Sequence, residues 1–375
     1  MISIVLPTYN GEKFISESID SILNQTFKDW ELIIVDDCST DNTAALVDSY
    51  AKKYDRIHVI HNKTNKKLPG ALNVGFKLAM GDYLTWTSDD NRFYPDALET
   101  MKDYLDTNKE YAMVCTAYSK MDESGVEFAK ANGYDEESMY FNDCVGACFL
   151  YRRQVYETIG GYDESVFCAE DYEYWLRVLM HCGKIGYIDD VHYAYRLHSG
   201  SLTVSKWVNV KKSLNEIRNR YFEIMFSRLS DNMDLLSGLY FDMIFTDSLT
   251  DEMKSRFCER IPQLDIIDEN VGLNGPVIIY GAGEFGEKAY NLVKDNAVAY
   301  VDRDENKHGL TKNGLRILNI DELIRDYKDY NIVIAISSKY TYKVAMYLRN
   351  LGCNKIGSFQ YLMRNQVRRE ATSQS

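Results

Sequence analysis

Short runs of aliphatic and β-branched residues alternate with amphipathic stretches over residues 1–204. The runs have the length and composition of buried strands, and the stretches have the spacing of helices with one apolar face. The predicted strands are Ile2–Leu6, Glu31–Val35, Ile57–Ile60, Tyr83–Thr87 and Ala112–Thr116, and the predicted helices are Lys13–Gln25, Thr43–Lys53, Gly70–Met80 and Pro95–Asn108. This alternation favours βαβ units and a largely parallel sheet with helices on both faces.

Beyond this region the pattern changes. Residues 205–272 lack strand signals and are predicted to form a helical connector. Its amphipathic stretch around Trp207–Leu229 carries the basic residues Lys206, Lys211, Lys212, Arg218, Arg220 and Arg228. They form either a surface for peripheral contact with a membrane or acceptor, or the solvated face of a packing helix. Strand signals return in residues 273–362, at 276–280, 298–301 and 332–336, and the polar tail 363–375 is predicted to be disordered.

Charge and cysteine content narrow the class of protein. A formal net charge of -13 argues against a nucleic-acid partner, because surfaces that bind phosphate backbones are basic. The eight cysteines include no C-x-x-C pair, which indicates reduced thiols. The first predicted strand begins at once, and no apolar run approaches the ~18 residues of a membrane span. We therefore expect a cytoplasmic protein, in solution or at the inner face of the membrane.

Three acidic pairs in the first half of the chain are candidates for the chemistry of a site: Asp36-Asp37, Asp89-Asp90 and Glu170-Asp171. The first two follow predicted strands, and ligands of parallel sheets bind beyond the carboxyl ends of the strands. A nucleotide-sugar transferase needs such a set of carboxylates. One accepts hydrogen bonds from the nucleoside, one binds a metal on the diphosphate, and one deprotonates an acceptor hydroxyl.

The residues around these pairs resemble a known family. The segments Leu6–Asn10, Ile34–Asp41 and Thr85–Asn91 have the order and spacing found at the start of family 2 glycosyltransferases with the GT-A fold. The resemblance covers residues 1–204. It implies an α/β protein with a GT-A nucleotide-diphospho-sugar transferase domain, followed by the helical connector and a small Rossmann-like parallel-sheet domain.

The resemblance implies a donor site built from several loops. It places Tyr9 near the nucleobase and Asp37 on the nucleoside, while Asp36 is expected to hold the turn after it. Lys67 is expected either to supply positive charge to the diphosphate or to be a solvated loop residue. Leu72 stands where many relatives carry arginine. The expected donor-binding residues are Pro7, Tyr9, Asn10, Asp37, Lys67, Asn73, Asp89 and Arg196.

Ser88-Asp89-Asp90 resembles the D-x-D motif of the family, with serine at its first position. The resemblance implies that Asp90 binds Mn²⁺ or Mg²⁺, which prefer carboxylate and phosphate oxygens. Asp89 is expected to contact the ribose or to support the metal ligands. In the segment 195–201, His198 is expected to complete the metal shell or to touch the diphosphate, and Arg196 to neutralise phosphate.

The segments Gly160–Glu164 and Glu170–Arg177 resemble the acceptor side of the family site. The resemblance makes Asp171 the catalytic base, with Glu170 and Trp175 as acceptor contacts. The alternative for the acidic pair is a negatively charged first turn, which helix N-termini favour. The alternative for Trp175 is a place in the core.

Gly281, Gly283 and Gly286 follow a predicted strand and precede a helix, and Asp302 follows the next strand. This is the context of a dinucleotide-binding loop, and it predicts a Rossmann-like fold. The segment is about half the size of a full dinucleotide domain. A second nucleotide site at these four residues and a purely scaffolding or dimerising role, with a homo-oligomer, both stay open.

We therefore predict an inverting, metal-dependent, non-processive glycosyltransferase of the hexosyltransferase type. It is expected to move one sugar from a nucleoside-diphosphate sugar, UDP-linked by preference, to a hydroxyl of a glycan or lipid-linked acceptor in surface polysaccharide synthesis. The alternatives are an NAD(P)-dependent oxidoreductase or a nucleotide-sugar sensor that uses the C-terminal glycine loop. A sugar nucleotidyltransferase is disfavoured, because such enzymes open with a glycine-rich loop where this chain has Pro7–Gly11.

Overall fold

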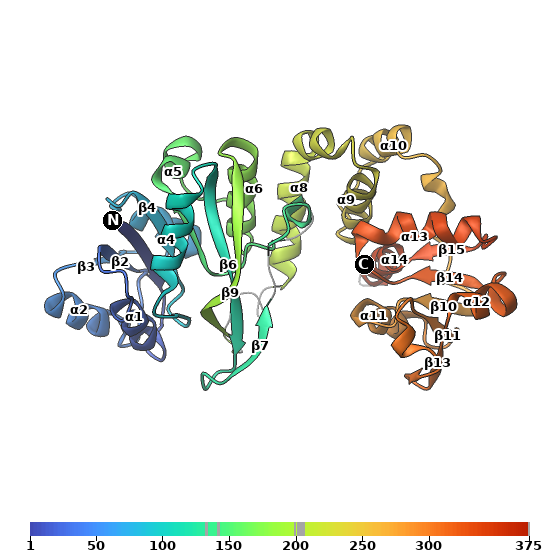
Figure 1. Cartoon of the computed structure of the whole chain (residues 1–375), viewed down its shortest axis with the longest axis horizontal. Coiled ribbons are helices and arrows are strands. Elements are labelled where there is room, and N and C mark those ends of the chain that lie inside the picture. Colours follow the sequence, from blue (N-terminus) through green and yellow to red (C-terminus); the bar gives the residue numbers. More distant parts are fainter. Residues whose placement is uncertain (132–133, 141–142, 199, 201–206, 374–375) are drawn as a thin grey trace. The chain divides into compact units, whose positions relative to one another are not determined.

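The computed structural model describes residues 1–131, 134–140, 143–198, 200 and 207–373 (Figure 1). The chain divides into two compact units, Met1–Ser213 and Leu214–Ser375. The predicted boundary between residues 204 and 205 and the predicted basic residue Lys206 lie outside the described residues, as does the side chain of Lys211.

The elements of the first unit follow the predicted alternation. Its strands are β1 (Ile2–Thr8), β2 (Trp30–Asp36), β3 (Ile57–His61), β4 (Tyr83–Trp86), β5 (Arg92–Phe93), β6 (Tyr111–Met121), β7 (Glu127–Ala131), β8 (Phe149–Arg152) and β9 (Lys184–Arg196). Its helices are α1 (Ile15–Leu23), α2 (Thr43–Lys53), α3 (Lys67–Phe76), α4 (Ala97–Thr107), η1 (Ser138–Tyr140), α5 (Arg153–Ile159) and α6 (Glu170–His181). Every strand and helix predicted here is present, with ends shifted by a few residues.

These strands form one mixed sheet in the order β3-β2-β1-β4-β8-β6-β9-β5, with β7 paired to β6. β1 is parallel to both β2 and β4, and β2 is parallel to β3. β8 is antiparallel to β4 and to β6, so β4 and β6 run in the same direction. The long strands β6 and β9 are parallel neighbours, drawn side by side in green in Figure 1. The carboxyl ends of β1, β2, β3 and β4 therefore share one edge of the sheet.

Apolar spacing explains how both faces of this sheet are covered. Ile15, Ile19 and Ile22 lie on one face of α1, are fully buried, and join the same core cluster as Ile4 and Leu6 of β1. The helix α3 lies against β1 and β2 and approaches closely at Gly75, where a Cβ atom would lie 2.4 Å from Val5 Cγ1. A side chain at residue 75 would therefore force α3 away from the sheet.

The first strand extends beyond its predicted end at Leu6 and includes Pro7. β1 continues through Thr8, and Pro7 is paired in register with Val35 of β2. Parallel strands direct successive residues to alternate neighbours. Thr8 O accepts from Asp37 N at 2.8 Å and Val5 O accepts from Thr87 N at 3.0 Å, so Pro7 is directed to the β4 side, past the end of β4. Its missing N–H therefore removes no bond to β2.

The second unit contains most of the predicted connector and the C-terminal domain. The connector elements are α8 (Trp207–Leu229), α9 (Met233–Phe245), α10 (Asp251–Arg260) and η2 (Leu264–Ile266). The strands that follow are β10 (Val277–Tyr280), β11 (Ala297–Val301), β12 (Thr311–Lys312), β13 (Leu315–Leu318), β14 (Asn331–Ile334) and β15 (Ile356–Ser358). The helical segments between and after them are α11 (Glu284–Val293), η3 (Glu305–Lys307), α12 (Ile320–Glu322), η4 (Leu323–Tyr327), α13 (Ser338–Asn350) and α14 (Phe359–Ser373).

The second sheet has the order β12-β13-β11-β10-β14-β15. Every pair is parallel except the antiparallel pair β12 and β13. The first strand, β10, lies in the middle of the sheet, and the chain winds outward from it in both directions. The connector helix α9 packs on α13 and α14 within this unit.

The prediction of disorder from residue 363 is wrong for the described residues. They belong to α14, which begins at Phe359. Tyr361 and Leu362 are buried, and Arg364 and Arg368 form ion pairs with Glu269 and Asp247. The polar composition of the tail suggested disorder, but the apolar residues that anchor α14, Phe359, Tyr361 and Leu362, lie at the start of the helix.

Two glycines at the start of α11, Gly283 just before the helix and Gly286 in its first turn, provide a matched test of this packing. A Cβ atom at Gly286 would lie 1.9 Å from Gly281 O, whereas a Cβ atom at Gly283 would meet nothing within 4 Å. We expect Gly286→Ala to lower the free energy of unfolding of the full chain by about 1–3 kcal/mol, as overpacking does. We expect Gly283→Ala to change it by less than ~1 kcal/mol. Urea unfolding measures both, and equal losses would contradict this account of the loop.

Candidate active site

The loops after β1 and β2 are bound to each other at the carboxyl edge of the first sheet. Asn10 Oδ1 accepts from Thr40 N at 2.8 Å, and Asn10 N donates to Ser39 Oγ at 3.0 Å. Asn10 adopts a positive φ of 56° at this turn. Tyr9 is 52% exposed, so its ring is available to a ligand at this edge.

Asp36 and Asp37 are both buried but have different partners. Asp36 accepts from Ser39 N at 3.1 Å and lies 2.8 Å from His61 Nδ1, so it holds the turn as expected. The hydrogen bond that His61 makes with the Asp36 carboxylate is the main reason that the pKa of His61 is raised. Asp37 accepts from Asn62 Nδ2 at 2.8 Å and from Lys66 N at 2.9 Å. It therefore orders the loop before α3, and its contact with a nucleoside stays a prediction.

Lys67 begins α3 with a positive φ of 61° and is exposed. Its ammonium group lies 5.0 Å from the centre of the Phe167 ring. Its contact with a diphosphate also stays a prediction.

Asp89 is packed against the β1 loop. Its Oδ2 accepts from Thr8 Oγ1 at 2.5 Å. A Cβ atom at Gly11 would lie 2.2 Å from the same oxygen, so only glycine permits this approach. Desolvation, together with the neighbouring Asp90 charge, raises the pKa of Asp89 to about 7. Sequence reasoning did not single out Gly11, although its place directly after Asn10 was visible.

Asp90 and His198 come together as predicted, with 3.0 Å between Asp90 Oδ2 and His198 Nε2. The other oxygen, Asp90 Oδ1, is buried and has no hydrogen-bond partner. An orphaned carboxylate oxygen beside an imidazole fits the ligand preferences of Mn²⁺ and Mg²⁺. Within the described part of the chain, no group of three or more His, Cys, Asp or Glu side chains could hold a metal. A metal here would therefore need diphosphate and water oxygens as further ligands.

Arg196 does not face a donor, which corrects its predicted role. The side chain is 2% exposed, and its guanidinium lies 4.6 Å from the centre of the Phe14 ring. Its nitrogens donate to Asp90 O at 2.8 Å, to Glu123 O at 3.0 Å and to Glu17 Oε2 at 2.5 Å. The guanidinium is thus used to position Asp90. Glu17 lies in the first turn of α1, and nothing in the sequence pattern identified it as a partner of Arg196.

Asn73 is hydrogen-bonded to the loop 160–164, and its contact with a donor stays a prediction. Its Oδ1 accepts from Tyr162 N at 2.8 Å and its Nδ2 donates to Tyr162 O at 2.9 Å. The Tyr162 hydroxyl accepts from Trp86 Nε1 at 2.9 Å, at the end of β4. Asp171 and Glu170 act electrostatically on the same hydroxyl. Tyr162 thus links the edge that carries Asp89 and Asp90 to the start of α6.

Glu170 and Asp171 begin α6; Glu170 is buried and Asp171 is half-buried. Glu170 is 4% exposed and its Oε2 has no hydrogen-bond partner. Burial, aided by the Asp171 charge, raises the pKa of Glu170 to about 8. Desolvation also raises the pKa of Asp171, whose Oδ1 accepts from Tyr172 N at 2.8 Å. A carboxylate with a raised pKa is a better proton acceptor near neutral pH than an exposed aspartate.

Trp175 is not an acceptor platform, which corrects that prediction. It is fully buried, and its ring centre lies 4.5 Å from that of Phe149 in an edge-on arrangement. Helical spacing turns this side of α6 toward the sheet, so the alternative of a core residue is the right one.

The glycine loop of the second unit has the predicted placement between β10 and α11. Asp302 Oδ2 accepts from Ala282 N at 2.8 Å and from Lys307 Nζ at 3.1 Å. Lys312 Nζ donates to the carbonyls of Ala282 and Gly283, each at 3.1 Å. These contacts hold the loop to its own domain. A second nucleotide site at Gly281, Gly283, Gly286 and Asp302 stays a prediction.

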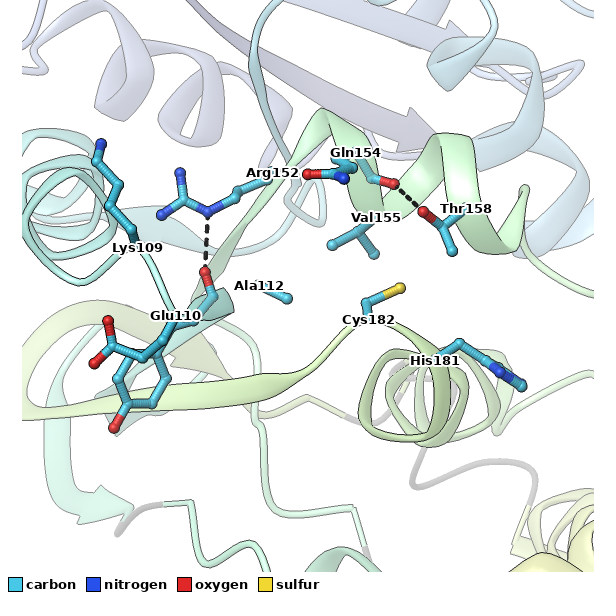
Figure 2. A pocket seen from close by; sticks show the side chains of 10 residues that line it. Lys109, Glu110, Ala112, Arg152, Gln154, Val155, Thr158, His181 and Cys182 are labelled. Atoms are coloured by element: carbon cyan, nitrogen blue, oxygen red, sulfur yellow. Dashed lines mark hydrogen bonds between the residues drawn. The ribbon is translucent and has the colours of Figure 1, made fainter.

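A cavity of about 160 Å³ lies at the opposite edge of the first sheet. Its lining includes Tyr111 at the start of β6 and Cys182 just after α6. In Figure 2, Arg152 Nε donates to Tyr111 O at 2.9 Å and Thr158 donates to Gln154 O at 2.7 Å. Because β6 runs in the direction of β4, this cavity is remote from the strand ends that carry Asp37 and Asp90, and it holds none of the predicted site residues.

Two family models match the chain. Residues 3–160 match the model of glycosyl transferase family 2. Residues 273–356 match the model described as C2185-like, N-terminal. The first match lies in the unit that carries the acidic edge, and the second covers the parallel sheet of the other unit.

Curated relatives match the N-terminal half. EpsE of Bacillus subtilis, named as a glycosyltransferase, is 36% identical over 182 residues, which cover 47% of this chain and 66% of EpsE. TuaG of the same organism, named for teichuronic acid biosynthesis, is 28% identical over 57% of this chain and 85% of TuaG. Chondroitin synthase of Escherichia coli is 28% identical over 55% of this chain and 30% of its own length. The chain thus spans just under two thirds of EpsE.

The fold has a counterpart among solved structures. The S. aureus TarS fragment 1–349 in complex with UDP-GlcNAc matches with a TM-score of 0.51 and 18% identity, over 69% of this chain and 79% of TarS 1–349. At this identity the likeness shows the fold alone. The sheet topology, the family model and the named relatives agree that residues 3–160 are similar to family 2 glycosyltransferases and that the N-terminal unit has a GT-A-type fold.

Proposed function

We propose that this protein transfers one sugar from a UDP-sugar to a hydroxyl of a glycan or lipid-linked acceptor, with a divalent metal and with inversion at the anomeric carbon. The observation that carries the proposal is the buried, unpartnered Oδ1 of Asp90 beside His198. It leaves a ligand position at the strand ends where α/β sheets bind nucleotides.

The donor side rests on the exposed ring of Tyr9 and the ordered loop around Asp37. An aromatic ring can stack on a base. The structural relative TarS was solved with UDP-GlcNAc, which supports a uridine donor. Asp90 and His198 would hold Mn²⁺ or Mg²⁺, which would neutralise charge on the leaving diphosphate. Arg196 keeps Asp90 in place from behind, through its hydrogen bond to Asp90 O.

The acceptor side rests on the acidic start of α6. Asp171 would accept the proton of the acceptor hydroxyl as that oxygen attacks the anomeric carbon. Its raised pKa suits this role, and a positioned base contributes about 10²–10⁴-fold in rate. Attack by the acceptor itself, on the face opposite the leaving group, inverts the anomeric centre.

The biological setting is proposed from the names of the relatives. TuaG is named for teichuronic acid biosynthesis and chondroitin synthase for a polysaccharide. Synthesis of a surface polysaccharide is the setting that these names share. Within the described part of the chain, no helix combines the length and apolar character that a membrane crossing requires.

Removing the Asp90 charge should abolish metal-dependent donor binding. We expect UDP with Mn²⁺ to raise the melting temperature of the wild-type chain, since a ligand at 100 times its Kd adds about 2.7 kcal/mol of stability. Asp90→Asn keeps the size of the side chain and should lose that shift. Asp103→Ala, at an exposed position on α4, is the control. Stabilisation by NAD(P) alone, unchanged in Asp90→Asn, would favour the oxidoreductase or sensor alternative.

Removing the proposed base should separate binding from chemistry. We expect Asp171→Asn to lose at least ~10²-fold in sugar transfer, measured by UDP release with an acceptor mixture from cell-surface glycans. The same variant should keep the stabilisation by UDP and Mn²⁺. Transfer at the wild-type rate would exclude Asp171 as the base.

The buried Glu170 should make stability fall with rising pH. Its pKa is about 8 in the folded chain against 4.5 for the free side chain, so the folded state holds a proton that the unfolded state releases between these values. The wild type should therefore lose stability relative to Glu170→Gln from pH 5 to pH 8.5, by on the order of 2–4 kcal/mol. Urea unfolding at both pH values measures this, with the exposed Glu252→Gln as control. A constant difference would refute the buried, neutral Glu170.

A further inference from the structure

A histidine outside the predicted site residues is held between two carboxyl groups at the end of β3. His61 is the last residue of β3 and is paired in register with Asp36, the last residue of β2. His61 Nδ1 lies 2.8 Å from Asp36 Oδ2, and His61 Nε2 lies 3.0 Å from Asp48 Oδ1 on α2. In the described part of the chain, Asp36 and Asp48 are the charged groups that face the ring from β2 and α2, the elements packed against β3.

These two contacts require the charged form of the ring. A neutral imidazole has one N–H and one lone pair, whereas an ionised carboxylate only accepts hydrogen bonds. Both ring nitrogens can therefore donate to these carboxylates only in the imidazolium, which has two N–H groups. The side chain of Asp36 is 4% exposed, so the imidazolium also compensates a buried negative charge. The raised pKa of His61, caused mainly by the hydrogen bond with Asp36, agrees with this geometry.

The position of Asp36 controls the turn that follows β2. Its other oxygen, Asp36 Oδ1, accepts from Ser39 N at 3.1 Å. Ser39 Oγ in turn accepts from Asn10 N at 3.0 Å, and Asn10 directly follows the exposed ring of Tyr9. Three consecutive hydrogen bonds, His61 to Asp36, Asp36 to Ser39 and Ser39 to Asn10, thus connect His61 to the loop that carries Tyr9.

A second connection starts at the residue after His61. Asn62 N donates to Asp36 O at 2.9 Å, and Asn62 Nδ2 donates to Asp37 Oδ1 at 2.8 Å. Asp37 is the residue expected to contact the nucleoside. The contacts of His61 therefore fix the end of β3 and, through Asn62, the carboxylate of Asp37.

On the basis of the proposed function, we propose that His61 is a positioning residue for the nucleoside end of the donor site. As an imidazolium it holds Asp36 and, through the connections just described, the segments that carry Asp37 and Tyr9. When the ring loses its proton, only one of its nitrogens can still donate, and the buried Asp36 loses its compensating charge. Donor affinity is therefore greatest while the ring is charged and falls as rising pH removes the proton.

The charge of His61 can be measured without any substrate. The chain has six histidines, and the Hε1 signal of His61 in ¹H NMR is the one missing from His61→Gln. In the wild type it should titrate above pH 6.5, the ordinary histidine value, and in Asp48→Asn, which removes one of the two facing charges, it should titrate at lower pH. His58→Gln, at an exposed position of the same strand, is the control and should leave the signal unchanged.

Either of two NMR results would overturn the proposal. One is a His61 signal that titrates at or below pH 6.5 in the wild type. The other is a His61 signal that does not move in Asp48→Asn. Should His61→Gln fail to fold, Asp48→Asn decides alone, because its spectrum must then contain one displaced histidine signal.

The connection from His61 to the turn is tested by amide hydrogen exchange, again without substrate. Ser39 N and Asn10 N donate the hydrogen bonds of this connection. Because a half-exposed ion pair contributes modestly, both amides should exchange about two- to fivefold faster in His61→Gln than in His58→Gln at a pH where His61 is charged. Equal exchange in the two variants would refute the connection.

The positioning role has its own signature in donor binding. The Kd of UDP with Mg²⁺ should be about two- to fivefold higher in His61→Gln than in His58→Gln while His61 is charged, and the ratio should approach one as the ring is deprotonated. The ratio cancels the titration of the UDP phosphates and of the other groups that both variants share. A ratio of one at every pH, or a raised ratio that does not change with pH, would refute the positioning role.

Failure of the proposed function has a different outcome. If the wild type binds no UDP with Mg²⁺ at any pH, the donor site itself is refuted. The NMR and hydrogen-exchange results then still decide whether a charged His61 holds the turn after β2.

Discussion

The acidic edge of the first unit depends on one buried cation. Arg196 contacts Glu17 of α1, the Asp90 carbonyl after β4 and the Glu123 carbonyl in the turn between β6 and β7. The Arg196 side chain is 2% exposed, so loss of its partners would leave a buried charge without compensation, which is destabilising. Segments distant in sequence are thereby held around Asp90, which itself keeps one oxygen without a protein partner.

The two acidic sites differ in how their charge is managed. His198 contacts one carboxylate oxygen of Asp90, and the other oxygen has no hydrogen-bond partner, which leaves a place for an external cation. At the start of α6, burial raises the pKa values of Glu170 and Asp171, which favours their protonated, uncharged forms. One edge of the sheet therefore combines a position suited to a metal with a position suited to proton transfer. The separation follows from burial and partners, since the residue types are the same.

Much of this arrangement was predictable from local pattern. Strand and helix periodicity located the elements, and the parallel connections placed Asp37 and Asp90 at a common edge. The errors came from side-chain burial, which pattern alone does not report. Trp175 lies on the buried side of α6, and the guanidinium of Arg196 donates its hydrogen bonds to oxygens of the protein.

Pro7 has a consequence for the chain beyond its own strand. Val5 and Thr87 make the last ladder bond between β1 and β4, and the next one would require an N–H at residue 7. Proline has no backbone N–H, so the hydrogen-bonded pairing of β4 with β1 cannot continue past this residue. β4 ends at Trp86, Thr87 makes the last hydrogen bond to β1, and the residues after Thr87 can turn out of the sheet plane. The ring at position 7 thus acts as a stop that sets where the Ser88-Asp89-Asp90 turn begins.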